Sequence, residues 1–507
     1  MSPAANAKAA ARADLDPALL AFLHHPATHG GAPVQHIETH GAHVFLVGAR
    51  ALKLKKPVDF GYMDFSTLEK RKACLDNELM RNRRTAPDIY RAVVPIYRTP
   101  TGFSFAGEGP AVEYALDMAR FDDACVLARL AENDALTPIA AEAAARMIAD
   151  VHRRAPLVAR DGISGVEFVL QSNARLLRQE GGSFLDPGAL NALETTSRAE
   201  LARLTPLLNA RARAGLIRQC HGDLHLGNLF ARGDEVIAFD CIEFNDAMTE
   251  IDLYYDVGFF WMDLTARGLV DHANRALNAY LEQIAEGADA QALDGLAALP
   301  LFISMRAAVR AHVSAAQGRA MAAQQYLDLA LAALAPPTPR LVALGGLSGS
   351  GKSTFARRIA PRLDRSPGAV ILRSDALRKR LWGVAPTQIL PAEAYRPDES
   401  ARVYEVMSAH ARAALRAGRS VVLDAAHLRL PERQAAAQLA EEMGVPFTGI
   451  WLEAAPAVLA DRIAARRGDV SDADLAVLSQ QLSFDIGPIH WGRLSSDAAI
   501  EGLFAQN

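Results

Sequence analysis

Two short segments of the chain concentrate residue types that handle phosphate groups. His221 to Asn228 reads His-Gly-Asp-Leu-His-Leu-Gly-Asn. Gly346 to Ser353 reads Gly-Leu-Ser-Gly-Ser-Gly-Lys-Ser and fits the pattern G-x-x-x-x-G-K-[ST] of a phosphate-binding P-loop. A carboxylate, an amide, a lysine and flexible backbone amides are the groups that phosphoryl transfer from a nucleotide requires. The two segments together predict two nucleotide sites in series.

The first segment fits the pattern H-x-D-L-x-x-x-N of a phosphoryl-transfer loop. In such a loop the aspartate orients the acceptor hydroxyl and takes its proton, and the asparagine holds Mg²⁺. Two apolar runs that flank a Gly-Asp turn predict a hairpin directly after this loop, and it returns Asp240 to the loop. We therefore expect Asp223 to be the catalytic base and Asn228 and Asp240 to be metal ligands. A polar surface loop is the alternative interpretation.

These residues resemble the aminoglycoside phosphotransferase and choline kinase-like group of enzymes. Its loop reads H-G-D-x-H-x-x-N, and its metal aspartate follows a phenylalanine. Gly222 stands where protein kinases have arginine, which favours the small-molecule branch. The resemblance covers about residues 30–330 and implies a small α+β lobe followed by a helical large lobe. The matching residues are His221, Gly222, Asp223, His225, Asn228, Phe239 and Asp240.

The same resemblance implies a nucleotide-binding lysine on a strand, a glutamate on a helix and a hinge segment. Lys53 is the best match for the lysine, and Lys55 is its rival because alternation places both on one face of a strand. We expect Glu78 to pair with that lysine and residues 112–115 to form the hinge beside adenine. The alternatives are a solvated lysine face and an exposed helical glutamate.

Two further features qualify the resemblance. No G-x-G-x-x-G precedes Lys53, because residues 39–43 read Thr-His-Gly-Ala-His. The phosphate cover would then depend on one glycine and its polar neighbours. Asp252 and Asp256 resemble the downstream acidic segment of the group, in which Asp256 would brace the catalytic loop. A helix-capping or surface aspartate is the alternative for Asp256.

The second segment lies between an apolar run at 341–344 and a predicted helix that opens near Lys352. Its glycines permit tight turns that aim backbone amides at phosphate oxygens. Lys352 would reach the outer phosphates and Ser353 would hold Mg²⁺. A predicted strand at 420–424 ends at Asp424, which we expect to be a second metal ligand or, alternatively, a cap. The predicted nucleotide-binding residues here are Gly346, Gly349, Ser350, Gly351, Lys352, Ser353 and Thr354.

This half of the chain resembles small P-loop kinases of the polynucleotide kinase, gluconate kinase and zeta-toxin type. The shared features are Gly-Ser-Gly-Lys-Ser-Thr, then Ser-Asp-x-x-Arg, a strand aspartate and an arginine-rich segment. The resemblance implies that Asp375 is the base and that Arg378 contacts an anionic group of the acceptor. Arg462 and Arg466, with Arg467 beside them, would form a lid that stabilises the transferring phosphoryl group. A solvated helix face is the alternative for these arginines.

A basic run near Asp375 bears on the choice of acceptor. It consists of Arg373, Arg378, Lys379 and Arg380. Such a run attracts a phosphorylated acceptor or a nucleic-acid end, although a solvated helix face is more common. No aromatic residues interleave with it for base stacking. Nucleic acid is therefore an allowed acceptor that the sequence does not favour.

Bulk composition limits the remaining choices. The chain has 507 residues, a net charge of −4 and 50% hydrophobic residues, which fits two or three globular domains without a general preference for nucleic acid. Its four cysteines form no C-x-x-C pair, so neither a zinc site nor a disulfide framework is expected. Residues 1–11 lack the apolar core of a signal peptide, and no run is long enough for a membrane span. We expect a cytoplasmic protein without a membrane partner.

The sequence predicts an α/β multidomain protein. Residues 1–335 would form the protein-kinase-like two-lobed domain, with its small lobe ending at about 115. Residues 335–339 would form a Pro-rich linker, and residues 340–507 a P-loop domain with a parallel α/β sheet. ATP and Mg²⁺ are the expected cofactors of a bifunctional kinase that phosphorylates hydroxyls of small molecules. In the alternatives, one half senses nucleotide or holds substrate while only the P-loop domain catalyses, or the chain is a toxin-like or polynucleotide 5'-hydroxyl kinase.

Overall fold

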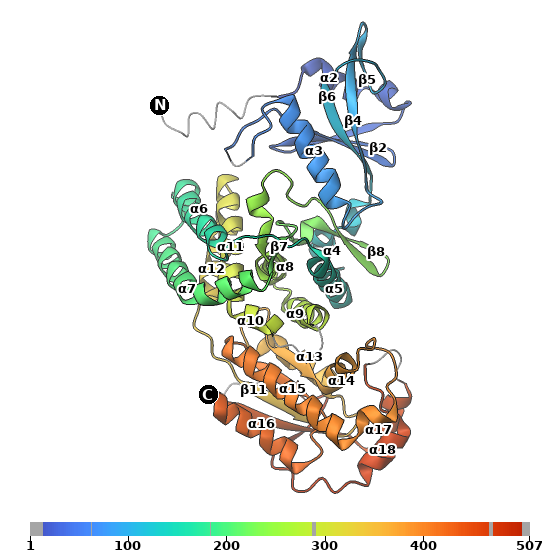
Figure 1. Cartoon of the computed structure of the whole chain (residues 1–507), viewed down its shortest axis with the longest axis vertical. Coiled ribbons are helices and arrows are strands. Elements are labelled where there is room, and N and C mark those ends of the chain that lie inside the picture. The colour runs from blue at the N-terminus through green and yellow to red at the C-terminus, as the bar shows by residue number, and fades with distance from the viewer. Residues whose placement is uncertain (1–13, 62, 183, 286–290, 466–469, 499–507) are drawn as a thin grey trace. The chain divides into compact units, whose positions relative to one another are not determined.

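The computed structural model describes residues 14–498 except 62, 183, 286–290 and 466–469. The chain divides into two compact units, each assembled from segments that are distant in sequence (Figure 1). Unit 1 comprises Met1–Leu136, Arg154–Arg160 and Ile217–Ile251. Unit 2 comprises Thr137–Arg153, Asp161–Leu216 and Asp252–Asn507.

Unit 1 is built on an antiparallel sheet with the strand order β1-β2-β3-β6-β4-β5. Helix α3 begins at a Thr67 cap, whose hydroxyl accepts the amide proton of Lys70. One face of the sheet packs its apolar side chains, among them Phe45 and Leu52, against helix α2. The elements are α2 (Pro17–His24), β1 (Val34–Glu38), β2 (Ala42–Val47), β3 (Arg50–Lys55), α3 (Leu68–Asn82), β4 (Tyr90–Thr99), β5 (Gly102–Ser104) and β6 (Glu113–Ala119).

The remainder of unit 1 carries the first sequence motif. Strands β8 and β9 form an antiparallel hairpin in register Leu229↔Ala238, as the sequence predicts. A short 3-10 helix, η3, ends at Asn228 immediately before β8. The elements here are η2 (Asp123–Cys125), α4 (Leu127–Glu132), β7 (Ile217–Gln219), η3 (Leu226–Asn228), β8 (Leu229–Arg232), β9 (Glu235–Ala238), η4 (Asp246–Met248) and β10 (Glu250–Asp252).

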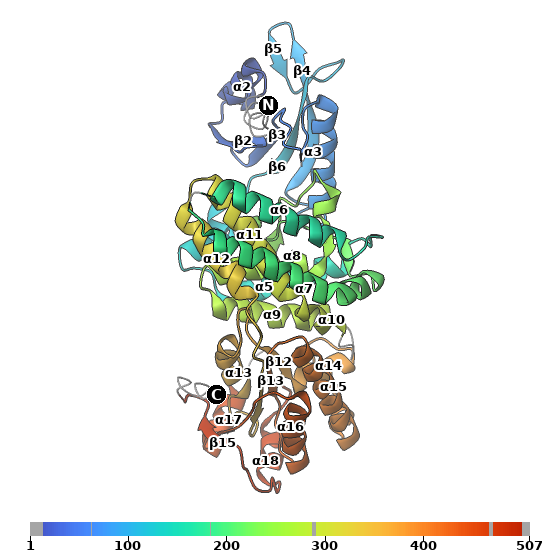
Figure 2. The same ribbon diagram turned by 90° about the vertical axis from the view of Figure 1, so that its left-hand side faces the viewer.

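The first part of unit 2 is helical. Helix α11 is buried along most of its length and packs against α6, α8 and α12. Figure 2 shows α6, α7, α11 and α12 packed side by side. Their bounds are α5 (Pro138–Arg154), α6 (Ser164–Gly181), α7 (Pro187–Arg213), α8 (Leu253–Ala266), α9 (Val270–Ile284), α10 (Gln291–Asp294), η5 (Gly295–Ala297), α11 (Leu299–Ala316) and α12 (Ala320–Ala333).

The second part of unit 2 is a five-stranded parallel sheet with the order β12-β13-β11-β14-β15. Every residue of β11 is buried, as expected for a central strand of a parallel sheet covered on both faces. The strands are β11 (Leu341–Gly345), β12 (Val370–Arg373), β13 (Val421–Asp424), β14 (Phe447–Glu453) and β15 (Gly492–Ser495). The helices are α13 (Lys352–Ile359), η6 (Ala360–Arg362), α14 (Ser374–Leu381), η7 (Ala392–Tyr395), α15 (Pro397–Arg416), α16 (Leu430–Met443), α17 (Pro456–Ala464) and α18 (Leu475–Leu482).

The predicted fold class is confirmed: an antiparallel sheet with a helical region is followed by a parallel P-loop sheet. Strand β15 is an addition that the sequence did not signal, because it is short and mostly exposed. Within the described part of the chain, every helix is too short or too polar to cross a lipid bilayer.

Candidate active sites

The β8–β9 hairpin brings Asp240 back to the first motif. The amide of Phe239 donates to the carbonyl of Asn228 at 3.0 Å, so the residues that enter and leave the hairpin lie side by side. Asp240 adopts a left-handed backbone with φ 58°. Its amide donates to the Tyr90 hydroxyl at 3.0 Å, and the next amide, of Cys241, donates to Asn82 Oδ1 at 2.9 Å. These bonds hold a strained residue in place beside the loop.

The predicted loop residues hydrogen-bond to one another. Asn228 Nδ2 donates to the Asp223 carboxylate and to its carbonyl, both at 2.9 Å. Asn228 Oδ1 therefore points away from Asp223, and this oxygen is the atom a metal ion would use. His221 donates through Nε2 to the Phe239 carbonyl at 2.9 Å, and its Nδ1 accepts the Asp223 amide proton at 3.3 Å. His225 Nε2 lies 3.4 Å from the Asp223 carboxylate.

Gly222 has a structural reason to be glycine. Its φ is +86°, and a Cβ at this position would lie 2.8 Å from the Met248 carbonyl oxygen. The backbone could not keep this path with a larger residue. The conformation of this turn therefore excludes the arginine that protein kinases have at this position.

Lys53 joins the loop to the sheet. Its ammonium lies 2.7 Å from Glu78 Oε1 and 2.7 Å from Asp240 Oδ1. Glu78 is fully buried on α3, whereas the side chain of Asp240 is 46% exposed. Burial lowers the pKa of Lys53, but the Asp240 and Glu78 carboxylates outweigh this effect and hold the pKa well above its usual value. Lys53 is thus a firmly charged group between three elements of unit 1.

Lys55 shares the face of β3 that carries Lys53 but has different surroundings. Its ammonium lies 2.6 Å from Glu78 Oε2 and 2.5 Å from Glu243 Oε1, and all three side chains are buried. Burial lowers the pKa of Lys55, and the charges of Glu243 and Glu78 raise it above its usual value overall. Glu243 was missed at the sequence level, since nothing local signals a partner 188 positions away.

The segment predicted as a hinge, residues 112–115, is not one. Residues 113–115 are the first three of strand β6, paired with Ile96, Pro95 and Val94 of β4. Glu113 is buried and forms an ion pair with Arg71 at 2.7 Å. The chain leaves the sheet only after Ala119, so a hinge would follow that residue. The phosphate-cover region is a tight turn, in which the Thr39 amide donates to the Ala42 carbonyl at 2.9 Å.

The two downstream aspartates are both buried within unit 2. Asp252 caps α8 and forms a two-bond ion pair with Arg211 at 2.7 and 2.8 Å. Asp256 is fully buried, and its carboxylate lies 3.1 Å from His152 Nε2. Asp256 is therefore not a surface residue.

The P-loop glycines in unit 2 each have positive φ and a close neighbour. A Cβ on Gly346 would lie 2.4 Å from the Leu452 carbonyl oxygen, and one on Gly349 would lie 2.6 Å from that of Leu459. Gly351 precedes α13, and a Cβ on it would lie 2.6 Å from the Ser496 side chain. The loop follows β11 directly, so its amides gather at the carboxyl end of the sheet, where ligands bind in α/β folds.

Lys352 lies across this loop. Its ammonium donates to the carbonyls of Gly346 and Leu347, both at 2.9 Å. Ser353 and Thr354 follow it in the first turn of α13. The buried Ser350 hydroxyl has no protein partner among the described residues, so its hydrogen-bonding capacity remains for a ligand. Gln481 of α18, which the sequence did not indicate, accepts the Ser348 amide proton at 2.8 Å.

Asp424 ends β13 beside the P-loop strand, in register with Leu344. It is buried, and its carboxylate lies 3.4 Å from Arg373 Nε. The Asp424 oxygen of this ion pair, Oδ2, makes no hydrogen bond within the described structure, so the Arg373 guanidinium is its charged neighbour there. His427, unpredicted, donates through Nδ1 to the Leu344 carbonyl at 2.9 Å. Burial lowers the pKa of His427 to about 4, so this imidazole is neutral at pH 7.

Asp375 lies in the first turn of α14, one turn before Arg378. Arg378 is buried, donates to the Ala394 carbonyl at 2.5 Å and stacks over the Tyr395 ring at 4.9 Å. Burial, a bond to Asp472 and the charge of Asp375 raise the pKa of Tyr395 above its usual value. Arg378 and Tyr395 therefore belong to one polar cluster, and Asp375 lies in the first turn of the helix that carries Arg378.

Asp472, which is distant in sequence, binds residues of this cluster. It lies 2.7 Å from the Lys379 ammonium, and it accepts the Tyr395 hydroxyl at 2.6 Å and the Leu390 amide at 3.0 Å. Lys379 is buried, as is Arg378, so these two members of the basic run are not on a solvated face. Asp472 carried no sequence signal.

The predicted lid is described only in part. Arg462 donates to the Ser496 hydroxyl at 3.1 Å, the same residue that a Cβ on Gly351 would meet. Arg462 thus lies next to the P-loop. Arg466 and Arg467 fall outside the described residues.

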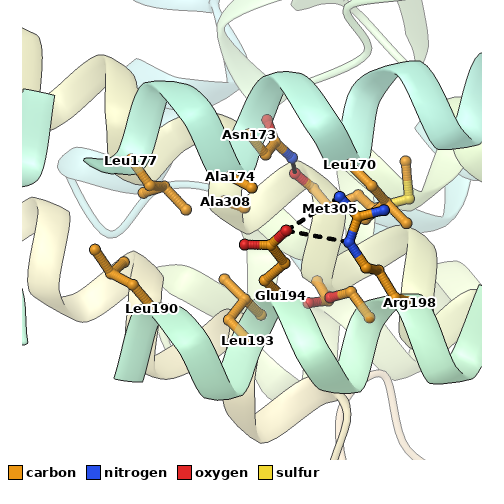
Figure 3. A pocket seen from close by; sticks show the side chains of 12 residues that line it. Leu170, Asn173, Ala174, Leu177, Leu190, Leu193, Glu194, Arg198, Met305 and Ala308 are labelled. Carbon is orange, nitrogen blue, oxygen red and sulfur yellow. Dashed lines mark hydrogen bonds and ion pairs between the residues drawn. The ribbon is translucent and has the colours of Figure 1, made fainter. Parts of the chain in front are cut away.

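A pocket in unit 2 contains none of the predicted site residues (Figure 3). Leucines of α6 and α7 face each other across it, and the Glu194–Arg198 ion pair of 3.0 Å borders it. It is lined by Leu170, Asn173, Ala174, Leu177, Leu190, Leu193, Glu194, Ser197, Arg198, Ser304, Met305 and Ala308.

Comparison with known proteins places these sites in context. Residues 102–299 match the phosphotransferase enzyme family, and residues 341–485 match an AAA domain. The chain is 30% identical to uncharacterized protein Rv2004c of Mycobacterium tuberculosis, over 89% of this chain and 90% of that protein. An uncharacterized protein of Mycobacterium bovis, Mb2027c, matches equally well. The chain belongs to the same family as these proteins. It joins a phosphotransferase-family domain to a P-loop domain of the AAA family.

Two solved structures align with parts of this family member. A choline/ethanolamine kinase family protein from Mesorhizobium loti aligns with 65% of this chain and 98% of its own, at 14% identity and a TM-score of 0.35. A gluconokinase from Sinorhizobium meliloti aligns with 32% of this chain and 86% of its own, at 22% identity and a TM-score of 0.22.

Proposed function

We propose that the protein is an ATP- and Mg²⁺-dependent phosphotransferase with two kinase sites, each of which transfers a phosphoryl group from ATP to a small-molecule hydroxyl. The main support is the ion-pair cluster of Lys53, Glu78 and Asp240 beside the Asp223–Asn228 loop. In a phosphotransferase these groups hold the nucleotide phosphates and the acceptor hydroxyl. The P-loop supports the second site.

In the first site, Asp223 would accept the proton of the acceptor hydroxyl. Its hydrogen bond to Asn228 Nδ2 and its contact with His225 fix the carboxylate in one orientation. Lys53 would contact the nucleotide phosphates, held there by Glu78. The donor set fits a hard cation, because Asn228 Oδ1 and the half-exposed Asp240 carboxylate are the oxygen ligands that Mg²⁺ prefers. Mg²⁺ neutralises phosphate charge when it is bound.

In the second site, the P-loop amides and Lys352 would hold the nucleotide phosphates. Lys352 must exchange its bonds to the Gly346 and Leu347 carbonyls for phosphate oxygens. Ser353 and the Asp424 carboxylate would hold Mg²⁺. Asp375 would take the acceptor proton, and Arg378 and Arg462 would stabilise negative charge around it.

A second candidate function applies to the first site alone. The tight Thr39–Ala42 turn replaces a glycine-rich cover, which favours a site that binds or senses nucleotide without turnover. In that case only the P-loop domain catalyses.

One experiment separates the two candidates. The full chain, Asp223→Ala and Lys352→Ala are each incubated with γ-labelled ATP, Mg²⁺ and a library of hydroxyl-bearing metabolites. Two active sites predict that each variant loses a different labelled product. If Asp223→Ala loses no product and Lys352→Ala loses all of them, the two-kinase proposal fails and the sensing function of the first site stands.

A further inference from the structure

Strand β12 is the edge strand of the P-loop sheet, and it leads directly into Ser374 and Asp375. Its inner side pairs with β13 through register Val370↔Val421, and the Val370 amide donates to the Ser420 carbonyl at 2.9 Å. The outward peptide groups of an edge strand need partners when they are buried. In this protein those partners come from helix α9 of the helical part.

Two asparagines of α9 supply the missing bonds. Asn278 Oδ1 accepts the Ile371 amide proton at 2.7 Å, and Asn278 Nδ2 lies 3.3 Å from the Ala369 carbonyl oxygen. Asn274 Nδ2 donates to the carbonyls of Ala369 and Pro367, both at 2.9 Å. Figures 1 and 2 both show α9 beside the P-loop sheet.

The bonds of Asn278 reproduce those of a strand. In a parallel ladder, one residue of the neighbouring strand accepts a hydrogen bond from the amide of residue i and donates one to the carbonyl of residue i−2. The side-chain amide of Asn278 does both, to Ile371 and Ala369. Both asparagines are at least nine-tenths buried, and their spacing of four places them on one face of α9.

The chain is shaped to admit this contact. Gly368 has φ +87°, and a Cβ at this position would lie 2.7 Å from Asn274 Nδ2 and 2.8 Å from the Ala360 carbonyl. A second contact is the hydrogen bond of 2.6 Å between the hydroxyls of Thr265 and Ser366. The backbone of residues 366–371, with Gly368, therefore packs closely against the helical part.

We propose that Asn278 and Asn274 are positioning residues of the P-loop kinase, acting through β12 on the placement of Asp375. This inference rests on the proposed role of Asp375. In consequence, helix α9 of the phosphotransferase-family domain contributes to the P-loop site. A shift of that helix would move β12 and, with it, Asp375.

Hydrogen exchange on the full chain tests the contact itself. Asn278→Leu removes both bonds, and the Ile371 amide should then exchange at least about tenfold faster, with peptides over 345–353 unchanged. Asn278→Asp keeps an acceptor for Ile371 and should accelerate it less. The matched control is Asp271→Asn, which removes only the negative charge of the exposed 3.1 Å pair between α9 and Arg362 and should change neither peptide. Unchanged Ile371 exchange in Asn278→Leu would overturn the proposal.

ATP turnover tests the positioning role. In an Asp223→Asn background, Asn278→Asp should lower kcat at the P-loop site at least about tenfold and leave KM for ATP within about twofold, because the P-loop follows β11 and not β12. A lower melting temperature with unchanged kcat would mean that α9 only stabilises the sheet, and would overturn positioning. Absence of ATP turnover in the background chain would instead overturn the proposed function of the P-loop site, while hydrogen exchange still decides whether α9 holds β12.

Discussion

The ammonium of Lys53 lies 2.7 Å from a carboxylate oxygen of Asp240, although 187 positions separate the two residues. This ion pair joins strand β3 to the end of the β8–β9 hairpin, and Glu78 attaches the same ammonium to helix α3. The groups that our proposal assigns to phosphate and metal are thus held together by the fold of unit 1. Several consequences can be measured.

Replacing Lys53 or Lys55 by methionine should affect different properties, ATP binding for Lys53 and stability for Lys55. Lys53→Met should weaken ATP binding at the first site at least about tenfold, because a charge near the phosphates is lost. Its effect on stability should be small, since Glu78 keeps Lys55 and Asp240 is half exposed. Lys55→Met should destabilise unit 1 by about 3 kcal/mol, because Glu243 is left buried without its cation.

Titration with an ATP analogue in a Lys352→Ala background and chemical denaturation separate these two effects. The opposite pattern, with Lys55→Met abolishing binding and Lys53→Met unfolding the unit, would exchange the roles of the two lysines.

Asp223→Asn should remove phosphoryl transfer at the first site by about 100-fold or more, since the proton acceptor is lost. ATP affinity should stay within about threefold, because Lys53 and Asp240 remain. Asp234→Asn, in the exposed turn of the same hairpin, is the matched control and should behave as the parent chain. Turnover that survives Asp223→Asn would remove this residue from the mechanism.

Asp472→Asn should disturb the acceptor side of the P-loop site. The change leaves the buried Lys379 without its anion and should lower the unfolding free energy by about 3 kcal/mol. Asp398→Asn, in the exposed first turn of α15, is the control. Differential scanning calorimetry gives the comparison, and equal melting temperatures for both variants would show that Asp472 does not hold the cluster.

Local pattern was enough to predict the elements that contain the motifs. The β8–β9 hairpin, the strand and helix around the P-loop, and the position of Asp424 at a strand end all follow from turn residues and apolar runs. The hinge was misplaced because only the family resemblance indicated it, whereas ladder pairing with β4 makes residues 113–115 a strand.

Long-range partners could not be read from the sequence. Glu243, Asp472 and the α9 asparagines each contact a residue more than ninety positions away or in another element, and no periodicity marks them. Burial decides which charged residues pair, and burial is a property of the folded chain. This is also why the sequence left Lys55 as a rival of Lys53, since both satisfy the same alternation.

Stability should fall as the solution becomes acidic. The folded pKa of His427 is about 4, below its unfolded value of about 6.5, because burial disfavours the charged imidazole. Between these values the unfolded chain binds more protons, so the unfolding free energy decreases as the pH drops from 6.5 to 4. This group alone contributes at most about 3 kcal/mol.

The prediction is tested by urea denaturation at pH 7.5 and pH 5 for the parent chain and for His427→Gln. The variant has no imidazole to titrate at this position, so its loss of stability over this range should be smaller. An equal loss in both proteins would show that His427 is not the source.

The stoichiometry of nucleotide binding tests the central claim most directly. Isothermal titration of the full chain with a non-hydrolysable ATP analogue and Mg²⁺ should give two sites per chain. Lys352→Ala should leave one site, and combining it with Lys53→Met should leave none of comparable affinity. A single site in the parent chain that disappears in Lys352→Ala would contradict the account of two nucleotide sites.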